Sequence, residues 1–240
     1  MLEFINVCKK YGEKIALDNV SFKVNNGEIV GFIGPNGSGK TTSIKLITNI
    51  INLTSGDIIV NNKSVLRQAF EIKKEIGYIS DSPDMFLRLK GIEYLNFIAD
   101  TYDVDMEERK RRIDEYAKLF ELEDSLNQPM INYSHGMRQK LMVMASLIHN
   151  PEVLLLDEPL TGLDPKSALN LKNIMKEYKQ NNKTVFFSTH VLEVAESLCD
   201  RIIFIYKSRI IFDGTIDDLK NKYPDKSLEE IYVCLINENS

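Results

Sequence analysis

A glycine-rich run carries the clearest chemistry in this sequence, Gly34-Pro35-Asn36-Gly37-Ser38-Gly39-Lys40-Thr41-Thr42. It matches the pattern G-x-x-x-x-G-K-[ST], in which glycines let successive backbone N–H groups curl around phosphate oxygens. In this pattern Lys40 reaches the β- and γ-phosphates, and the Thr41 hydroxyl ligates Mg²⁺. We therefore predict a site for ATP and Mg²⁺, with contacts from Gly34, Asn36, Gly37, Ser38, Gly39, Lys40, Thr41 and Thr42.

Two carboxylates, Asp157 and Glu158, follow an apolar run at residues 153–156. A phosphate site of this kind needs an acid on the neighbouring strand to hold Mg²⁺ through water, and Asp157 is placed for that role. The next side chain points the other way, so we predict that Glu158 is the general base for the attacking water. His190 follows another apolar run and is expected at the same sheet edge. There it would form a hydrogen bond with the γ-phosphate and orient Glu158 and the attacking water. The alternative is a strand that ends in solvent and a structural histidine, and the upstream glycine-rich run favours the catalytic interpretation.

Short strands and helices alternate around these residues in a pattern typical of an α/β fold with a parallel sheet. Apolar runs and turn residues predict strands at residues 2–7, 17–24, 29–33, 153–156, 184–188 and 202–206. The glycine-rich run is followed by apolar residues at helical spacing, namely Ile44, Ile47, Ile50 and Ile51. A predicted helix at 165–180 separates two of the later strands and indicates a right-handed parallel crossover.

The stretch from about residue 82 to residue 150 is different in kind. A predicted helix at 109–120 carries an apolar stripe of Ile113, Tyr116, Ala117 and Phe120. Ser134 is placed to cap another predicted helix at 137–149. We therefore predict a mostly helical subdomain, about 82–150, inserted in the α/β core, and a short helical tail at 214–240.

Composition and charge exclude several classes of protein. Hydrophobic residues make up 43% and charged residues 27%, which argues against a disordered or fibrous chain. The net charge is −5, and because a nucleic-acid binder needs a basic face, we expect no nucleic-acid partner. Three Cys without a CxxC pair argue against a disulfide framework or a zinc knuckle. The sequence holds no run of about 18 apolar residues, so we expect a cytoplasmic protein.

Further motifs resemble those of the ATP-binding cassette (ABC) ATPases. The run Tyr133-Ser134-His135-Gly136-Met137-Arg138-Gln139-Lys140 is similar to their LSGGQ signature, and it precedes the acidic pair as in that family. Thr161-Gly162-Leu163-Asp164 resembles the D-loop, Ser188-Thr189-His190 resembles the switch histidine, and Tyr11 sits where the adenine-stacking aromatic lies. Phe212-x-Gly214-Thr215 is typical of the family's C-terminal end, so the resemblance covers essentially the whole chain, 1–240, as a single cassette domain.

The resemblance implies a P-loop NTPase fold with a RecA-like parallel core, an antiparallel N-terminal β-subdomain and the inserted helical subdomain. It also implies a head-to-tail dimer with a second cassette subunit, in which ATP lies between the P-loop of one subunit and the signature of the other. Ser134 and the Gly136 N–H group would complete the γ-phosphate cage in trans, at the start of a helix. Tyr11 would stack on the adenine, and Asp164 of the D-loop would also contact the nucleotide.

Three positions depart from the family pattern. Asp81 stands where the Q-loop Gln is expected, at the end of Gly77-Tyr78-Ile79-Ser80-Asp81. We predict that this carboxylate ligates Mg²⁺ more strongly than Gln would, while it repels the γ-phosphate. His135 and Met137 replace a Gly and the Gln of the signature, whereas the phosphate contacts Ser134 and Gly136 are kept, so we expect an active ATPase. An acidic Q-loop residue resembles the exporter branch, which pairs a single-cassette chain with a separate membrane permease.

These features predict ATP hydrolysis that powers export through membrane permease subunits, with the cassette held on the inner face of the cell membrane by the permease. Residues 82–94 either dock on the permease or pack inside the helical subdomain, since the two patterns look alike in sequence. Two other functions stay open. One is a single-cassette assembly factor of the iron–sulfur type, without transport. The other is a nucleotide sensor that hardly hydrolyses ATP, which only Asp81 supports.

Overall fold

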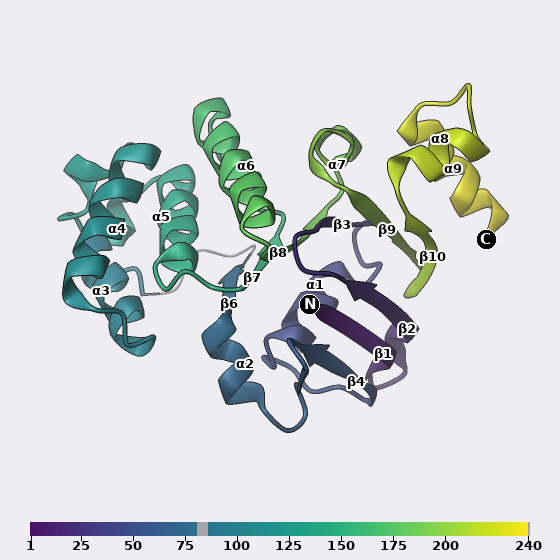
Figure 1. Cartoon of the computed structure of the whole chain (residues 1–240), viewed down its shortest axis with the longest axis horizontal. Coiled ribbons are helices and arrows are strands. Elements are labelled where there is room, and N and C mark those ends of the chain that lie inside the picture. The colour runs from purple at the N-terminus through teal and green to yellow at the C-terminus, as the bar shows by residue number, and fades with distance from the viewer. Residues whose placement is uncertain (81–85, 240) are drawn as a thin grey trace.

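The main sheet of the protein carries the strand ends that matter for function. The computed structural model describes residues 1–80 and 86–239 (Figure 1). The strand order of the main sheet is β10-β9-β3-β8-β7-β6. Its strands are β3 (Ile29–Ile33), β6 (Ile76–Ile79), β7 (Val153–Asp157), β8 (Thr184–Thr189), β9 (Arg201–Tyr206) and β10 (Arg209–Gly214). Neighbouring strands pair in parallel, apart from the antiparallel hairpin of β9 and β10.

Side chains of the main sheet alternate between hydrophobic cores on its two faces. One core joins helix α1 (Lys40–Ile47) and a second sheet to Val30, Phe32, Leu155 and Phe186. The other core joins helix α6 (Pro165–Gln180) and the helical lobe to Leu154, Leu156, Val185 and Phe187. Every residue of β3, β7 and β8 is buried, because a parallel sheet is covered on both faces.

A second, antiparallel sheet packs against the main one. Its strands, in the order β2-β1-β4-β5, are β2 (Lys14–Val24), β1 (Leu2–Tyr11), β4 (Ser55–Val60) and β5 (Lys63–Ser64). A column of aromatic rings joins the sheets: Phe22 lies 4.3 Å from Phe4, 5.7 Å from Phe32 and 5.6 Å from Phe186, between ring centroids. Such pairs stabilise the fold beyond their buried area. The column therefore holds β1, which ends at Tyr11, in place relative to β3.

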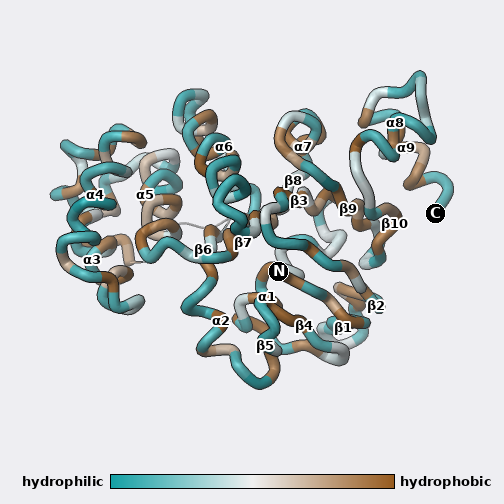
Figure 2. Tube along the Cα trace, in the orientation of Figure 1, coloured by the Kyte–Doolittle hydropathy of each residue, from teal (hydrophilic) through white to brown (hydrophobic). Residues whose placement is uncertain are grey.

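A helical lobe lies at the end of the molecule opposite the C-terminal helices (Figure 1). It follows α2 (Ala69–Glu75) and β6, and contains α3 (Gly91–Thr101), α4 (Met106–Phe120) and α5 (His135–Leu147). Ser134 caps α5, since its hydroxyl accepts a hydrogen bond from the Met137 N–H group at 3.2 Å. The apolar stripe of α4 is buried at Ile113, Ala117 and Phe120 and half-buried at Tyr116. Figure 2 shows hydrophilic residues along α4 and hydrophobic ones in the central strands.

Helix α1 is shorter than its apolar spacing indicates. The pattern runs on to Ile51, but the helix ends at Ile47 and Ile50 is exposed. The Thr48 hydroxyl donates hydrogen bonds to the Ile44 and Lys45 carbonyl groups, and Asn49 has a left-handed backbone with φ of 51°. Asn tolerates this conformation better than most residues, so the helix stops there although apolar residues continue.

The C-terminal part of the chain packs on the outer end of the main sheet. Helices α7 (Leu192–Leu198), α8 (Ile216–Lys222) and α9 (Leu228–Glu238) share a core with β3 and β9, at Ile33, Leu192, Phe204, Leu219, Leu228 and Ile231. The sequence did not predict β10, which turns back on β9 through Lys207 and Ser208, both with positive φ. In the described part of the chain, no helix has the length and apolar character needed to cross a membrane.

Truncation of the aromatic column should test how the sheets are held together. Phe186→Ala should lower the free energy of unfolding by about 3–5 kcal/mol, because the ring is fully buried between two sheets. Urea denaturation followed by circular dichroism measures this loss. Leu169→Ala on the exposed side of α6 is the control and should change it by less than about 0.5 kcal/mol. Equal losses in both variants would contradict this account of the column.

Candidate nucleotide-binding site

The carboxyl ends of three parallel strands bring the predicted functional residues to one edge of the main sheet. Ile33, at the end of β3, pairs in register with Thr189 of β8, and Ser188 pairs with Asp157 of β7. The glycine-rich run follows β3, Glu158 follows β7, and His190 follows β8. Ligands of open parallel sheets bind outside this edge. Residues far apart in the sequence thereby come together in space.

The glycine-rich run forms a tight loop that enters α1 at Lys40. Side chains are excluded from its floor. A Cβ atom at Gly34 would lie 2.3 Å from the Ile205 carbonyl oxygen, and one at Gly39 would lie 2.6 Å from that of Ala16. Gly39 also has φ of 119°, which residues with a Cβ rarely adopt. Glycine at these two positions therefore lets the loop pack directly on β9 and β2.

Lys40 lies beneath this loop, with only 6% of its surface exposed. Its Nζ atom donates a hydrogen bond to the Gly34 carbonyl group at 2.8 Å and lies 3.8 Å from Oε1 of Glu158. Burial lowers the pKa of Lys40, and the nearby Glu158 and Asp157 carboxylates oppose that shift. The positive charge is thus held between the loop and the acidic pair.

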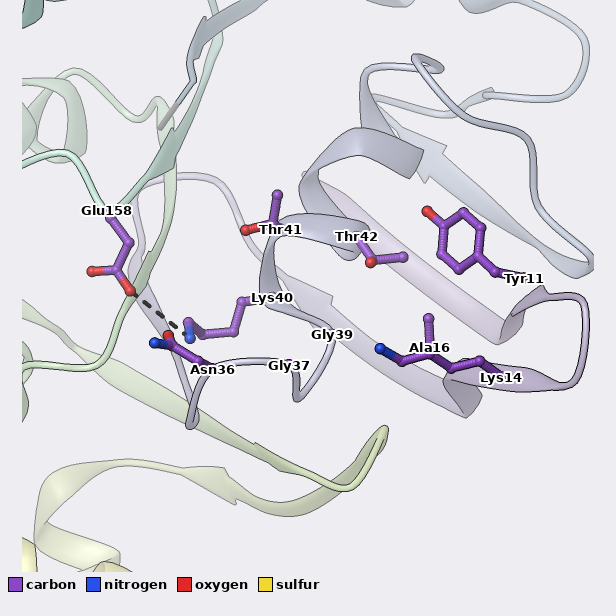
Figure 3. A pocket seen from close by; sticks show the side chains of 10 residues that line it. All are labelled: Tyr11, Lys14, Ala16, Asn36, Gly37, Gly39, Lys40, Thr41, Thr42 and Glu158. Carbon is purple, nitrogen blue, oxygen red and sulfur yellow. Dashed lines mark ion pairs between the residues drawn. The ribbon is translucent and has the colours of Figure 1, made fainter. Parts of the chain in front are cut away.

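A cavity of about 410 Å³ lies against the loop, a size that suits a small-molecule ligand (Figure 3). Tyr11 stands at one end of it, and Lys40 and Glu158 stand at the other (Figure 3). The lining residues are Tyr11, Lys14, Ala16, Asn36, Gly37, Gly39, Lys40, Thr41, Thr42 and Glu158. Lys14 and Ala16 were not predicted. Both lie on one face of β2, and Lys14 pairs with Tyr11 across the hairpin, so the spacing of two residues is the signal that could have found them.

Glu158 has a backbone conformation that is unusual for its residue type, with φ of 48°. Its N–H group donates to the Ser188 hydroxyl at 3.1 Å, and that hydroxyl donates to the fully buried Asp157 carboxylate. The Oε1 atom of Glu158 lies 2.9 Å from Nδ1 of His190. Strained residues held by such contacts cluster at functional sites. Ser188 is a positioning residue that the strand pattern alone did not reveal.

A smaller cavity of about 210 Å³ adjoins the first, and Asn36 and Glu158 line both. The other residues around it are His135, Gln139, Thr161 and His190. The His135 ring lies so close to Gly162 that a Cβ atom there would come within 2.6 Å of His135 Cδ2. The first residue of α5 therefore packs on the loop that follows Glu158 in the same chain.

Three residues predicted to contact nucleotide, Ser134, Gly136 and Asp164, do not line the larger cavity within the described structure. Ser134 and Gly136 lie at the start of α5. Asp164 caps α6 through the Ser167 N–H group at 2.9 Å, and it pairs with Nζ of Lys140 at 2.7 Å. The hydrogen bond from Lys140, followed by those from Ser167, holds the pKa of Asp164 well below its usual range.

The remaining predicted residues are placed as follows. Gly34 and Ser38 belong to the loop itself, and Ser38 is buried. Thr41 lines the larger cavity, whereas Asp157 lies at the end of β7. Asp81 falls outside the described residues. Among those described, no cluster of three or more His, Cys, Asp or Glu side chains is arranged to hold a metal ion by itself.

Comparison with known proteins bears on this geometry. The sequence profile of the family described as "ABC transporter" matches residues 17–161, more than half of the chain. The chain belongs to the ABC transporter family. It is therefore an ATP-binding subunit and an ATPase of that family, with the α/β P-loop fold that its sequence predicts. These findings confirm the family, the fold class and the enzyme activity.

Individual relatives agree with this assignment. The ABC transporter ATP-binding protein NatA of Bacillus subtilis is 32% identical over 91% of this chain and 89% of its own length. The linearmycin resistance ATP-binding protein LnrL of the same species is 32% identical over 99% of this chain and 76% of its own. The ATP-binding cassette MJ0796, solved as a dimer with ADP and Pi, superimposes with a TM-score of 0.81 at 28% identity. That match covers 90% of this chain and 99% of the other.

The ion pair of Asp164 with Lys140 should make stability depend on pH. Asp164→Asn keeps a good helix cap but removes the charge, so it should cost up to about 1 kcal/mol at neutral pH. Because folding lowers the pKa of this carboxyl, its contribution is complete above the unfolded pKa of about 3.9 and is lost as pH falls below it. Thermal unfolding of both proteins from pH 7 to pH 3 measures the difference.

Asp225→Asn, in the exposed loop between α8 and α9, is the charge-matched control. It should leave stability unchanged at each pH. A difference between wild type and Asp164→Asn that stays constant down to pH 3 would rule out the ion pair as its source.

Proposed function

We propose that this chain hydrolyses ATP to power a separate membrane permease, and that the transporter is an exporter. The observation that carries the proposal is the convergence of the glycine-rich loop, the acidic pair and His190 at one edge of the main sheet. The direction is supported by the relative LnrL, which is a linearmycin resistance ATP-binding protein. In this arrangement the cassette lies on the inner face of the cell membrane, where the permease holds it.

The triphosphate of ATP fits the loop by its chemistry. Ser38 Oγ is buried and has no hydrogen-bond partner among the described residues, so it can accept or donate to a ligand in the loop. The backbone at Gly37, where a Cβ atom would meet no neighbour, is open for N–H groups to approach phosphate oxygens, and Lys40 supplies the positive charge. Asn36 lines the cavity beside Lys40, Thr42 lines it between Lys40 and Tyr11, and Tyr11 stacks on the adenine at the other end (Figure 3).

Mg²⁺ fits the site only together with phosphate, since the described residues form no metal cage of their own. Thr41, which lines the cavity, and Asp157, buried at the end of β7, would hold it through a hydroxyl and a carboxylate. When bound, the ion neutralises charge on the phosphate oxygens. Asp81 is proposed as a further ligand from the sequence alone.

Glu158 and His190 carry the catalytic roles in this proposal. Glu158 takes the proton from the attacking water, whose oxygen bonds to the γ-phosphorus while the bond to the β–γ bridging oxygen breaks. ADP leaves with the electron pair of that bond. His190, 2.9 Å from Oε1 of Glu158, holds the carboxylate in position and reaches the γ-phosphate.

A second cassette subunit completes the site in a head-to-tail dimer. Ser134, Gly136 and Asp164 lie outside the larger cavity of their own chain, and the solved MJ0796 cassette is a dimer. The first turn of α5, which follows Ser134 directly, carries the positive end of the helix dipole. Placed against the loop of the other subunit, Ser134 and Gly136 would bind the γ-phosphate from the side that the larger cavity leaves open.

An exposed aromatic pair on the helical lobe is the proposed contact with the permease. Phe86 and Phe97 are 47% and 48% exposed, and their rings lie 5.6 Å apart. Leu89, in contrast, is half-buried and packs on the core of the lobe. Of the apolar residues in the segment 82–94, those before Phe86 lie outside the described residues. The proposal therefore rests on Phe86 and Phe97, because two adjoining exposed rings form an apolar patch whereas the other exposed aromatic residues among those described stand singly.

Replacement of the base should separate binding from turnover. Glu158→Gln keeps the shape of the side chain but cannot take a proton, so ATP hydrolysis should fall by about 100-fold or more while ATP still binds. Phosphate release measures the rate, and gel filtration with ATP should detect a trapped dimer. Glu152→Gln, at the other end of β7, is the matched control and should turn over normally. Hydrolysis at the wild-type rate in Glu158→Gln would remove it from the role of base.

The permease partner should be recovered from detergent-solubilised membranes with the tagged chain. Phe97→Ser should lose most of the co-purified membrane protein, because it removes half of the exposed aromatic pair, and its ATPase rate in isolation should not change. Leu169→Ser, at a residue on α6 that is also exposed, should retain the partner. Recovery of no membrane protein by wild type would overturn the transporter proposal, and full recovery by Phe97→Ser would overturn the docking surface alone.

A further inference from the structure

A lysine lies over the ring of Tyr11, the aromatic residue at one end of the larger cavity. Nζ of Lys9 is 4.7 Å from the centroid of the Tyr11 ring, within the range of a cation–π interaction. Tyr11 is nearly half exposed and lines the cavity, whereas Lys9 is not among the described lining residues. The ammonium group therefore contacts the Tyr11 ring without belonging to the set of side chains that line the cavity.

Lys9 is held in this position by a second contact. Its Nζ atom donates a hydrogen bond to the Asn52 carbonyl group at 2.7 Å, and its side chain is half-buried. Asn52 lies in the segment between α1 and β4. Because α1 begins at the phosphate-binding loop, one lysine side chain joins the Tyr11 end of the cavity to the segment that leaves the loop helix. The neighbouring Lys10 is exposed and makes neither contact in the described structure.

We propose that Lys9 is a positioning residue that sets how strongly this site prefers a purine nucleotide. The inference rests on the proposed stacking of the base on Tyr11. An aromatic face carries negative charge density, and so does the face of a purine base. A cation that contacts the Tyr11 ring from outside the cavity lining draws that density away and reduces the repulsion between the two stacked rings. Adenine, which has the larger π-surface, gains more than a pyrimidine does.

Fixing the ring adds to the same effect. An exposed tyrosine at the end of a strand would lose rotational freedom when a base stacks on it, and that loss weakens binding. Lys9 holds the ring before the nucleotide arrives, because its ammonium group is itself fixed by the Asn52 carbonyl group. Loss of the Lys9 charge should therefore weaken the binding of the base and leave the binding of the phosphates unchanged.

The test compares ligands with and without a base. Lys9→Met keeps the length of the side chain and removes its charge. Calorimetric titrations with Mg-ATP, Mg-CTP and Mg-tripolyphosphate measure the binding. The Kd for ATP should be about twofold to fivefold higher in this variant than in wild type. The Kd for tripolyphosphate should not change, and the preference for ATP over CTP should shrink. Lys9→Arg should restore the wild-type values, since a guanidinium group can make both contacts.

Lys10→Met makes the same change of charge at the next residue and should match wild type for every ligand. The ratio of the Kd values for ATP and tripolyphosphate does not depend on the folded fraction, so it remains decisive if Lys9→Met is less stable. An unchanged ratio, whether both ligands weaken together or neither does, would overturn the inference.

Tyr11→Ala separates this inference from the one beneath it. If Tyr11→Ala weakens ATP binding and Lys9→Met does not, only the role of Lys9 fails. If Tyr11→Ala binds ATP as wild type does, the proposed stacking on Tyr11 fails, and the role of Lys9 fails with it.

Discussion

The hydrogen-bonded ladder that joins β3, β8 and β7 in parallel register determines the rest of the site. Ile33 pairs with Thr189, and Ser188 pairs with Asp157, so the three strands end along one line. A shift of one residue in either pairing would turn alternate side chains to the other face of the sheet. The register is secured by burial, because every residue of these strands is buried. The phosphate-binding loop, the acidic pair and His190 meet as a consequence.

Two further sets of contacts build on that ladder. The column of aromatic rings fixes the antiparallel sheet on the main sheet, and so it sets where Tyr11 stands relative to the loop. Ser188 joins the side chain of Asp157 to the backbone of Glu158, which has a positive φ. The aromatic column thereby sets the position of Tyr11 at one end of the cavity. The hydrogen bonds of Ser188 direct the Glu158 carboxylate toward Lys40 and His190.

The sequence predicts those parts of the structure that depend on local pattern. The strand at Ile29–Ile33 and the helix at Pro165–Gln180 have the predicted bounds, because each is an apolar pattern bounded by turn or cap residues. The apolar spacing runs on to Ile51, whereas α1 ends at Ile47, because Asn49 adopts a left-handed backbone. Lys14 and Ser188 were missed as site residues, because their importance depends on a cross-strand partner and on a hydrogen bond to a distant carboxylate. Asp164 shows the same limit: its contact with Lys140 joins residues on two helices.

We propose that the edge of the main sheet holds half of an ATPase site and that a second cassette subunit, in the simplest case a second copy of this chain, supplies the other half. The most direct measurement mixes two inactive variants, Lys40→Ala, which keeps the signature, and Ser134→Glu, which keeps the phosphate-binding loop. If dimers form at random head to tail, half of them contain one intact site out of two, and ATPase activity should recover to roughly a quarter of wild type. Activity of the mixture that equals the mean of the separate variants would show that each chain completes its own site, and would contradict the account.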